Sequence, residues 1–477
     1  MRKNSTDSTA TPVLLQTLIT LLMAHRSAFK QERPFRRAVA LVFGEVFAFA
    51  RHTVTQSLLA LGLTDADWTA WYRLFSRERF DEAALTGCLF RETLAHVAVD
   101  EPYVIGVDGT QIPRTSHTMV GTGWLRAPRT AVFKRGIHRA QRFVHGAWLT
   151  PIQEGYARAI PLRFLPAFPQ KAVRRELPAR KEWEAGLEFV AWVRRGLDQA
   201  GRVGQRLIVL GDGAYDTLDF WRGLPPNAIA IVRTARNRKL REPLPAEWSG
   251  DKRRKYGPQA PRPEDWLAQR KGWLKTMVDV RGRAFELRYR ILGPYVRERA
   301  AERPLFLIVI GGAVWKAGKK EPRRARRRPS FYLVSAIQRD GVWQMPLDAK
   351  QVLEWVWQRW ELEVAHREMK SSFGVGEKQC FSPRAAVVSV QWSVWVYAVL
   401  VLAGYRAWGL FGGPPTPARW WGGARRWSFT TLWRSYRAAL WGTTEFRAVW
   451  TQTSDNWPAK EAALTALANA VAGAARA

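Results

Sequence analysis

Hydrophobic residues recur at helical spacing through the first hundred residues of the chain. The spacing is clearest in Phe35–Phe49, Thr53–Leu61 and Trp68–Phe75, and Gly62 suits the end of the second stretch. We therefore expect a helical N-terminal domain over residues 1–98. Several arginines lie among these helices, which favours DNA binding; the alternative is a domain that only supports packing. These arginines are Arg51, Arg73, Arg77 and Arg79.

From Pro102 onward the pattern changes to short apolar runs that are typical of strands. The elements expected in this part are strand Tyr103–Asp108, strand Arg142–Ile152, strand Ala157–Phe164, helix Ala179–Ala200, strand Arg206–Gly211, helix Thr217–Trp221 and strand Ala228–Val232. This succession is the order of an RNase H-like α/β fold, whose first part we place at residues 99–235. If the first and fourth strands are neighbours, their carboxyl ends meet at one edge of the sheet.

Residues 236–327 interrupt this order and predict a β-rich, basic insertion. Its first third is rich in Pro, Arg and Lys and shows little periodicity. The elements expected after that are a hairpin of Trp273–Val280 and Ala284–Ile291 around Arg281-Gly282, the strand Leu305–Ile310 and a basic run over Lys316–Arg328.

The second part of the core, residues 328–412, begins with the strand Phe331–Ala336. Asp348 suits the N-cap of a long helix that continues to about Ser371. Val388–Tyr405 has no charged residue and approaches the length of a membrane span. It contains Ser and Gln, however, so we expect a buried core helix and no membrane partner. Residues 413–477 predict a helical, basic C-terminal region.

The charge of the chain narrows the class of partner. Its 477 residues include 75 Lys and Arg against 41 Asp and Glu, a formal net charge of +34. A surplus of this size spread over the whole length indicates a protein that binds nucleic acid. Cys88 and Cys380 are the two cysteines and form no CxxC pair, so neither a disulfide framework nor a zinc site is expected. A reducing compartment, the cytoplasm, is the simplest location.

Three carboxylates stand in settings that suit a metal site. Asp108 and Asp212 each end an apolar run that predicts a strand, and Glu363 lies in the predicted long helix. Carboxylate oxygens are hard ligands that hold divalent metal ions for phosphoryl transfer. Asp216 and Asp219 lie near Asp212 and are alternative ligands, although the strand-end position favours Asp212.

One face of the long helix combines Glu363 with basic side chains. Residues three, four and seven apart share a helix face, and that spacing joins Glu363 to Arg359, His366, Arg367 and Lys370. The arrangement suits a carboxylate that holds a metal while cations bind flanking phosphates. Taken alone, it is equally typical of an exposed helix with ordinary ion pairs.

The carboxylates and their surroundings resemble the bacterial DDE transposases of the IS4 group. Arg359, Glu363 and Lys370 match the spacing of the Tyr-x2-Arg-x3-Glu-x6-Lys motif, whereas Val356 stands where that motif has its tyrosine. Asp212-Gly213-Ala214-Tyr215 is similar to the Asp-x-x-Tyr motif of the family. The basic stretch Val232–Arg238 resembles the one that follows the next strand. Asp108-Gly109-Thr110 and Arg51–Thr55 are closest to IS701-type members, and the resemblance covers roughly residues 35–400.

The resemblance implies a transposase that cleaves transposon ends and joins them to target DNA by two-metal phosphoryl transfer. Asp108, Asp212 and Glu363 would be the ligands of two Mg²⁺ ions per site, with Mn²⁺ able to substitute. It also implies DNA partners (the terminal inverted repeats and the target), a homodimer in the synaptic complex, and a bacterial, nucleoid-associated protein. The alternatives are an inactive, transposase-derived DNA-binding protein and an RNase H-like nuclease. The residues expected to contact DNA are Arg359, Lys370, Trp360, Arg233, Arg238, Tyr215, Arg326, Arg327 and Arg328.

Overall fold

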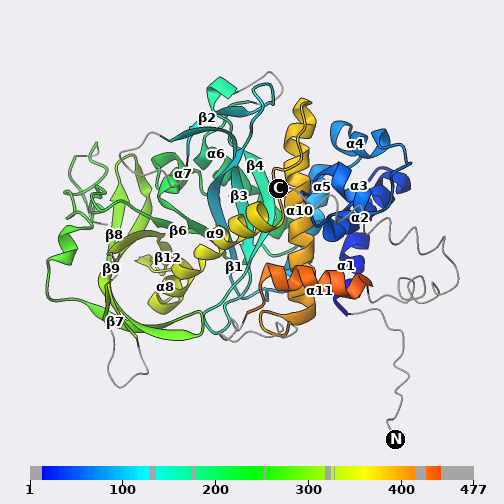
Figure 1. Cartoon of the computed structure of the whole chain (residues 1–477). Helices are drawn as coiled ribbons and strands as arrows, with labels where there is room; N and C mark the ends of the chain where they lie inside the picture. The colour runs from blue at the N-terminus through cyan, green and yellow to red at the C-terminus, as the bar shows by residue number, and fades with distance from the viewer. Residues whose placement is uncertain are drawn as a thin grey trace, which may run out of the picture.

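The structure of the chain is a computed structural model. It describes residues 13–127, 136–172, 178–245, 248–251, 253–316, 324–326, 328–413 and 426–441. A large sheet occupies one side of the molecule and the N-terminal helices the other, and the long helix α10 (Pro383–Trp408) stands between them (Figure 1).

Within the described residues, eleven strands form one mixed sheet. Its central strands run in the order β3-β1-β5-β6, and β4 pairs with β3 on its other side. β3 is antiparallel to β1, whereas β1, β5 and β6 are parallel. This topology confirms the RNase H-like fold. The strands are β1 (Tyr103–Pro113), β2 (Thr122–Arg126), β3 (Ile137–Leu149), β4 (Ala159–Pro166), β5 (Leu207–Gly211) and β6 (Ala228–Arg233).

The parallel strands form where the sequence is continuously apolar. All five residues of β5 are buried, and Tyr103–Val107 of β1 are buried as well. Parallel strands covered on both faces need side chains that are apolar on both faces, unlike the alternating pattern of a half-exposed strand. The helices α6 (Glu182–Gln199) and α7 (Leu218–Gly223) follow β4 and β5 as expected.

The strands expected in the insertion extend the same sheet. β11 is antiparallel to β6, and β9, β8 and β7 follow it in order. The turn between β7 and β8 has positive φ at both Arg281 (53°) and Gly282 (69°), the backbone of a tight hairpin turn. This confirms the predicted hairpin. The strands are β7 (Leu274–Val280), β8 (Arg283–Arg297), β9 (Ala300–Lys316), β10 (Arg324–Arg326), β11 (Ser330–Ser335), and a separate pair, β12 (Ile337–Arg339) and β13 (Val342–Gln344).

Two elements differ from the sequence prediction. Asp108 does not end the first strand, because antiparallel pairing with β3 continues β1 to Pro113. The predicted long helix is interrupted at Arg359 into α8 (Ala349–Gln358) and α9 (Trp360–Arg367), followed by the π-helical turn η5 (Glu368–Ser372). Asp348 caps α8 as expected, since its Oδ1 accepts from the backbone N–H of Gln351 at 2.9 Å.

The N-terminal region is helical as predicted. Asp81 caps the last of its helices by accepting from the backbone N–H groups of Ala83 and Ala84. The hydrophobic spacing in the sequence does not single out the first or the last of these helices. The helices are α1 (Val13–Ala24), α2 (Glu32–Phe47), α3 (Val54–Ala60), α4 (Thr69–Ser76) and α5 (Glu82–Leu94).

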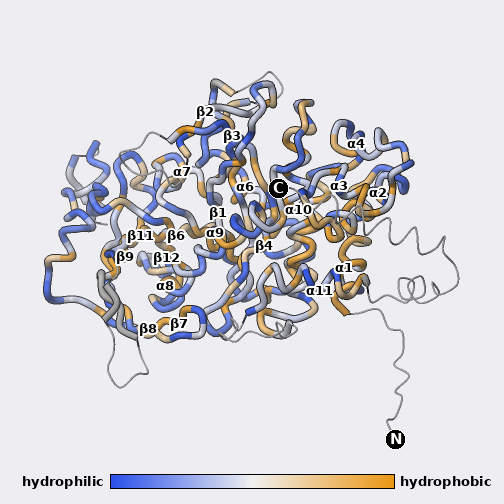
Figure 2. The backbone as a smooth tube through the Cα atoms, in the orientation of Figure 1, coloured by the Kyte–Doolittle hydropathy of each residue, from blue (hydrophilic) through white to orange (hydrophobic). Residues whose placement is uncertain are grey.

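The apolar helix α10 is a core helix. By length and composition it could cross a membrane, but 89% of its most apolar window is buried inside the protein. It packs against β4 on one side and α1 on the other, and the hydrophobic residues gather along these elements (Figure 2). The helix α11 (Phe429–Trp441) covers its C-terminal half, where the Tyr436 hydroxyl donates to the Leu400 carbonyl.

Candidate functional site

The three predicted carboxylates line one pocket at the carboxyl ends of the parallel strands. The pairing of β1 with β5 ends at Val107 and Gly211, so Asp108 and Asp212 are the next residue on each strand. Glu363 reaches the same pocket from α9, and the cavity has a volume of about 610 Å³. The rest of the lining consists of Gly213, Arg359 and residues at the end of β6 and the start of β11. These last residues are Arg233, Thr234, Ala235, Arg236, Arg238, Pro329, Ser330 and Phe331.

Close backbone packing brings α9 to this edge. A side chain at Gly106 would lie 2.6 Å from Leu362, so the glycine lets the helix approach β1 directly. Leu362 is fully buried there and fixes the neighbouring Glu363 beside the strand end. Asp212 is held by its own turn, because its Oδ1 accepts from the backbone N–H of Ala214 at 2.9 Å.

Arg359 supplies the positive charge between these acids. Its guanidinium lies 2.7 Å from Glu363 Oε1 and 3.9 Å from Asp108 Oδ2. Burial by itself would lower the pKa of Arg359, but the hydrogen bond to Glu363 and the charge of Asp108 raise it. In the part of the chain that the structure describes, no three Asp, Glu, His or Cys side chains lie close enough together to hold a metal ion.

The negative charge of the Asp108 carboxylate is unfavourable in the folded protein. Its side chain is 14% exposed. Burial, and then the charge of Asp212, raises its pKa to about 7, although Arg359 acts in the opposite direction. The folded protein therefore disfavours the ionised form of Asp108.

The raised pKa of Asp108 predicts a stability gain for Asp108→Asn in metal-free protein. An acid whose pKa is raised by folding costs stability as pH rises above its unfolded value, here from 3.8 towards about 7. At about pH 8 the variant should gain free energy of unfolding, at most about 4 kcal/mol, and near pH 4 it should gain almost none. Urea unfolding in chelator at the two pH values measures this. Asp219→Asn, at an exposed carboxylate, is the control; an equal gain there would contradict the prediction.

A fourth carboxylate, Glu182, was not among the acids predicted from the sequence. It is the first residue of α6, and its carboxylate occupies the space next to Gly109, so a side chain at residue 109 would displace it. Burial, and then the charge of Asp212, raises its pKa, while Arg142 lies 4.0 Å away. The glycine directly after Asp108 is a signal of close approach, but it does not say which residue approaches.

Two residues expected to bind DNA have other roles in this structure. Tyr215 is fully buried, so it has no surface for DNA; the Asp-x-x-Tyr spacing says nothing about burial. The guanidinium of Arg238 is bound to Asp216 at 2.6 Å, so it serves an internal ion pair although it also lines the pocket. Asp216, which Arg297 also contacts at 2.9 Å, is 4% exposed and is therefore not available as a metal ligand.

The other residues expected to bind DNA vary in accessibility. Arg233 and Arg328 are exposed, and Trp360 is 52% exposed on α9. Lys370 is half-buried, and its charge contributes to lowering the pKa of His145 after burial itself. The side chain of Arg326 and all of Arg327 lie outside the described residues.

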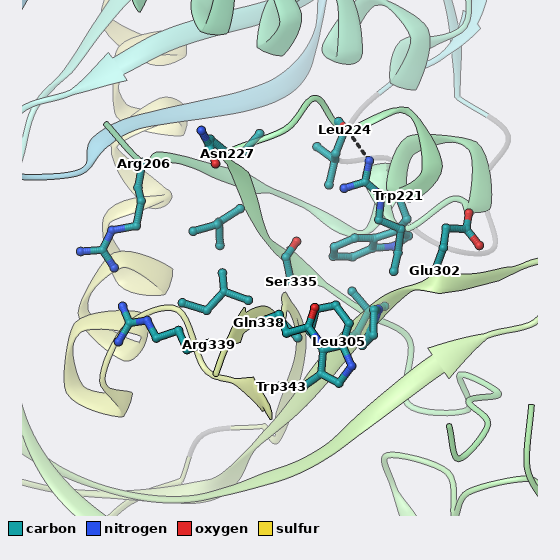
Figure 3. A pocket seen from close by; sticks show the side chains of 16 residues that line it. Arg206, Trp221, Leu224, Asn227, Glu302, Leu305, Ser335, Gln338, Arg339 and Trp343 are labelled. Atoms are coloured by element: carbon teal, nitrogen blue, oxygen red, sulfur yellow. Dashed lines mark hydrogen bonds between the residues drawn. The ribbon is translucent and has the colours of Figure 1, made fainter. Parts of the chain in front are cut away.

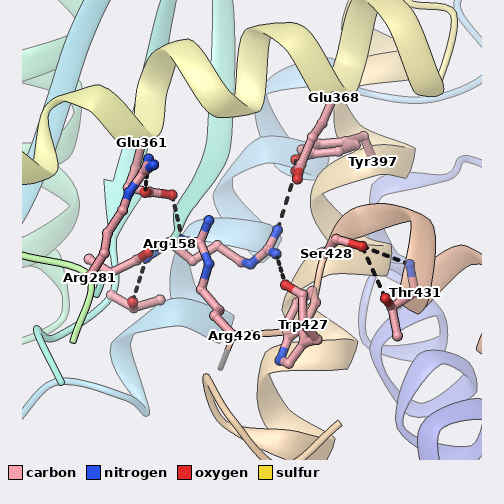
Figure 4. A network of polar contacts seen from close by, with 11 residues as sticks. Arg158, Arg281, Glu361, Glu368, Tyr397, Arg426, Trp427, Ser428 and Thr431 are labelled. Carbon is pink, nitrogen blue, oxygen red and sulfur yellow. Dashed lines mark hydrogen bonds and ion pairs between the residues drawn. The ribbon is translucent and has the colours of Figure 1, made fainter. Parts of the chain in front are cut away.

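Ion pairs of buried carboxylates hold the helix that carries Glu363 (Figure 4). Glu361 contacts Arg426 at 2.5 Å and Arg281 at 3.6 Å. Glu368, at the other end of α9, contacts Arg158 at 3.3 Å. These carboxylates flank Glu363 along the chain, so the helix is fastened on both sides of it.

The segment before α11 takes part in this network. Arg158 donates to the Trp427 carbonyl at 2.8 Å and lies 3.8 Å from the centre of its ring. The Tyr397 hydroxyl of α10 donates to Glu368 at 2.6 Å. The described part of the C-terminal region is thus packed onto the helix that bears Glu363.

A second pocket lies at the opposite edge of the sheet (Figure 3). Its volume is about 430 Å³, and its walls include the residues just before β5 and β6. Two of its arginines bind backbone carbonyls: Arg206 that of Pro346 and Arg303 that of Leu224. Glu302 is the one acidic residue in its lining, so this pocket lacks the chemistry found at the strand ends.

Comparisons with known proteins bear on the family of the chain. A solved structure of a piggyBac transposase synaptic complex with hairpin DNA matches with 10% sequence identity, covering 96% of this chain and 77% of that chain, at a TM-score of 0.35. A likeness at that score defines neither fold nor function. No curated protein matches the chain. The sequence model of the DDE superfamily endonucleases matches residues 26–291, which is more than half of the chain and includes Asp108 and Asp212. The chain therefore belongs to the DDE superfamily of endonucleases.

Proposed function

We propose that the protein is a DDE transposase that cleaves transposon ends and joins them to target DNA by two-metal phosphoryl transfer. The observation that carries the proposal is the meeting of Asp108, Asp212 and Glu363 in one pocket at the carboxyl ends of the parallel strands. The family match covers the first two of these acids, and the third comes from the helix beyond its end. The charge of +34 suits DNA as the substrate.

The residues of the pocket have the ligand chemistry for divalent metal, and the three carboxylates would have to draw closer together to hold an ion. Asp108, Asp212 and Glu363 offer only carboxylate oxygens, the ligand type that Mg²⁺ prefers, and Mn²⁺ accepts the same ligands. The pKa of Asp108 is raised by burial and then by the charge of Asp212, and a bound dication would favour its ionised form. When bound, two Mg²⁺ ions would lower the pKa of the attacking water and stabilise the leaving oxygen.

The side chains of the pocket orient the DNA around these acids. Arg359, which now compensates Glu363 and Asp108, is placed to bind a phosphate that enters the pocket. Arg233 and Arg236 are exposed on its wall and suit the neighbouring phosphates. Trp360 presents a half-exposed indole on the same helix and suits stacking on an unpaired base.

The N-terminal helices offer a second surface for the DNA backbone. A pocket of about 240 Å³ between α2 and α4 is lined by four arginines, and none of the four forms an ion pair with another described residue. Such a cluster suits phosphate contacts that position the transposon end without reading its sequence. We propose the terminal inverted repeats as its ligand and a homodimer as the synaptic assembly. The arginines are Arg33, Arg37, Arg73 and Arg79.

The test uses purified protein and the DNA that flanks its gene. With Mg²⁺ and a supercoiled target, we expect nicking at the terminal repeats followed by joined products, and chelator should abolish both. Scrambled ends are the control. Cleavage without end preference or joining would identify a nuclease instead, and end binding without any cleavage would identify an inactive descendant.

A further inference from the structure

Two histidines, His145 and His366, lie next to Asp108 and have no role in the function proposed so far. His145 is the direct cross-strand partner of Asp108 on β3. His366 lies on α9, three residues after Glu363. His145 Nδ1 lies 2.8 Å from His366 Nε2, and His366 Nδ1 lies 3.8 Å from Asp108 Oδ2. The two rings and the carboxylate thus form one chain of contacts.

Both imidazoles are shielded from water. His145 is fully buried, and the side chain of His366 is 12% exposed. At 2.8 Å the contact between the two ring nitrogens has room for one hydrogen only, so one nitrogen donates and the other accepts. The nitrogen that accepts is bare, and its ring therefore carries a hydrogen on the other nitrogen.

The surroundings decide which ring donates. If His366 donated from Nε2, His145 would carry its hydrogen on Nε2, which is buried without any hydrogen-bond partner. The Nδ1 of His366 would then carry no hydrogen, and its lone pair would face the negative charge of the Asp108 carboxylate. If His145 donates from Nδ1 instead, its Nε2 is only an unused acceptor. His366 then carries its hydrogen on Nδ1, directed at Asp108, which satisfies both contacts.

We propose that His366 is a positioning residue that donates from Nδ1 to Asp108 Oδ2, and that His145 fixes His366 in this tautomer. The inference rests on the proposed metal-dependent function. At 3.8 Å the contact is longer than a hydrogen bond, so the proposed donation requires the Asp108 side chain to turn towards His366. Holding one carboxylate oxygen in this way leaves the other directed into the pocket as a ligand.

Two measurements other than catalysis test the inference. ¹⁵N spectra of histidine-labelled protein report the tautomer of each ring, and the His366 signals are assigned by their loss in His366→Asn. We expect the Nδ1–H form for His366. Mn²⁺ binding, followed by electron paramagnetic resonance, should weaken by about 10- to 100-fold in His366→Leu. His366→Asn retains an N–H donor near the same place and should recover most of the affinity.

The controls separate the outcomes. His25 is also buried and bonds the Leu21 carbonyl far from the pocket, so His25→Leu should leave Mn²⁺ affinity unchanged. An Nε2–H tautomer for His366 in the parent protein would overturn the inference, even if His366→Leu failed to fold. Parental Mn²⁺ affinity in His366→Leu would overturn it as well, with the proposed function intact. A parent protein that binds no Mn²⁺ would overturn the proposed function and the positioning role together.

Discussion

Asp108→Asn, Asp212→Asn and Glu363→Gln are each expected to reduce DNA strand cleavage by at least about 10³-fold. Each change replaces a charged oxygen ligand with a neutral amide, and metal ions contribute several kcal/mol of transition-state stabilisation, about tenfold in rate for each 1.4 kcal/mol. Binding of end DNA should stay close to that of the parent, because phosphate contacts from basic residues dominate affinity. Single-turnover cleavage and a binding titration on the same DNA measure the two effects separately.

Asp219→Asn is the matched control for these variants. Asp219 lies seven residues after Asp212 and is exposed on α7, so its loss should leave cleavage unchanged. Glu182→Gln tests the fourth acid: a loss as deep as that of Asp212→Asn would add it to the ligands. Substantial cleavage by Glu363→Gln with unchanged Mg²⁺ dependence would show that Glu363 is not a metal ligand and that α9 supplies no catalytic carboxylate.

The order of strands and helices in the core could be predicted because the residues of each parallel strand indicate a strand without reference to its neighbours. The runs that end at Val107 and Gly211 are apolar on both faces, and this pattern needs no knowledge of distant residues. Asp212 was accordingly placed at its strand end. The further course of β1 beyond Asp108 depends on pairing with β3, a partner that the run itself does not specify.

Contacts between distant segments account for the features that the sequence did not predict. Glu182 enters the site through the space at Gly109, and Tyr215 is buried because of the helices packed over its turn. Glu361 and Glu368 have the sequence pattern of ordinary charges on an exposed helix. Their partners Arg426 and Arg158 lie 65 and 210 residues away, so the burial of these pairs follows from the tertiary structure alone.

Arg158→Met is expected to destabilise the fold more than any of the other single substitutions. Arg158 and Glu368 have side chains that are 3% and 11% exposed. Removing one partner of a buried pair leaves the other charge uncompensated, which costs about 3–5 kcal/mol. Tyr397 still donates to Glu368, so we expect the lower part of this range. Chemical unfolding, read by the fluorescence of the tryptophans, measures the loss.

The double variant Arg158→Met/Glu368→Met distinguishes an unpaired charge from lost packing. If the cost arises from the carboxylate left in the core, removing that carboxylate as well should restore much of the stability. Arg36→Met is the surface control, since its pair with Glu32 is exposed and screened by water, so its loss should change stability little. A double variant as unstable as Arg158→Met would instead locate the cost in the stacking of Arg158 on Trp427. The segment before α11, rather than the ion pair, would then be what holds the helix of Glu363 in place.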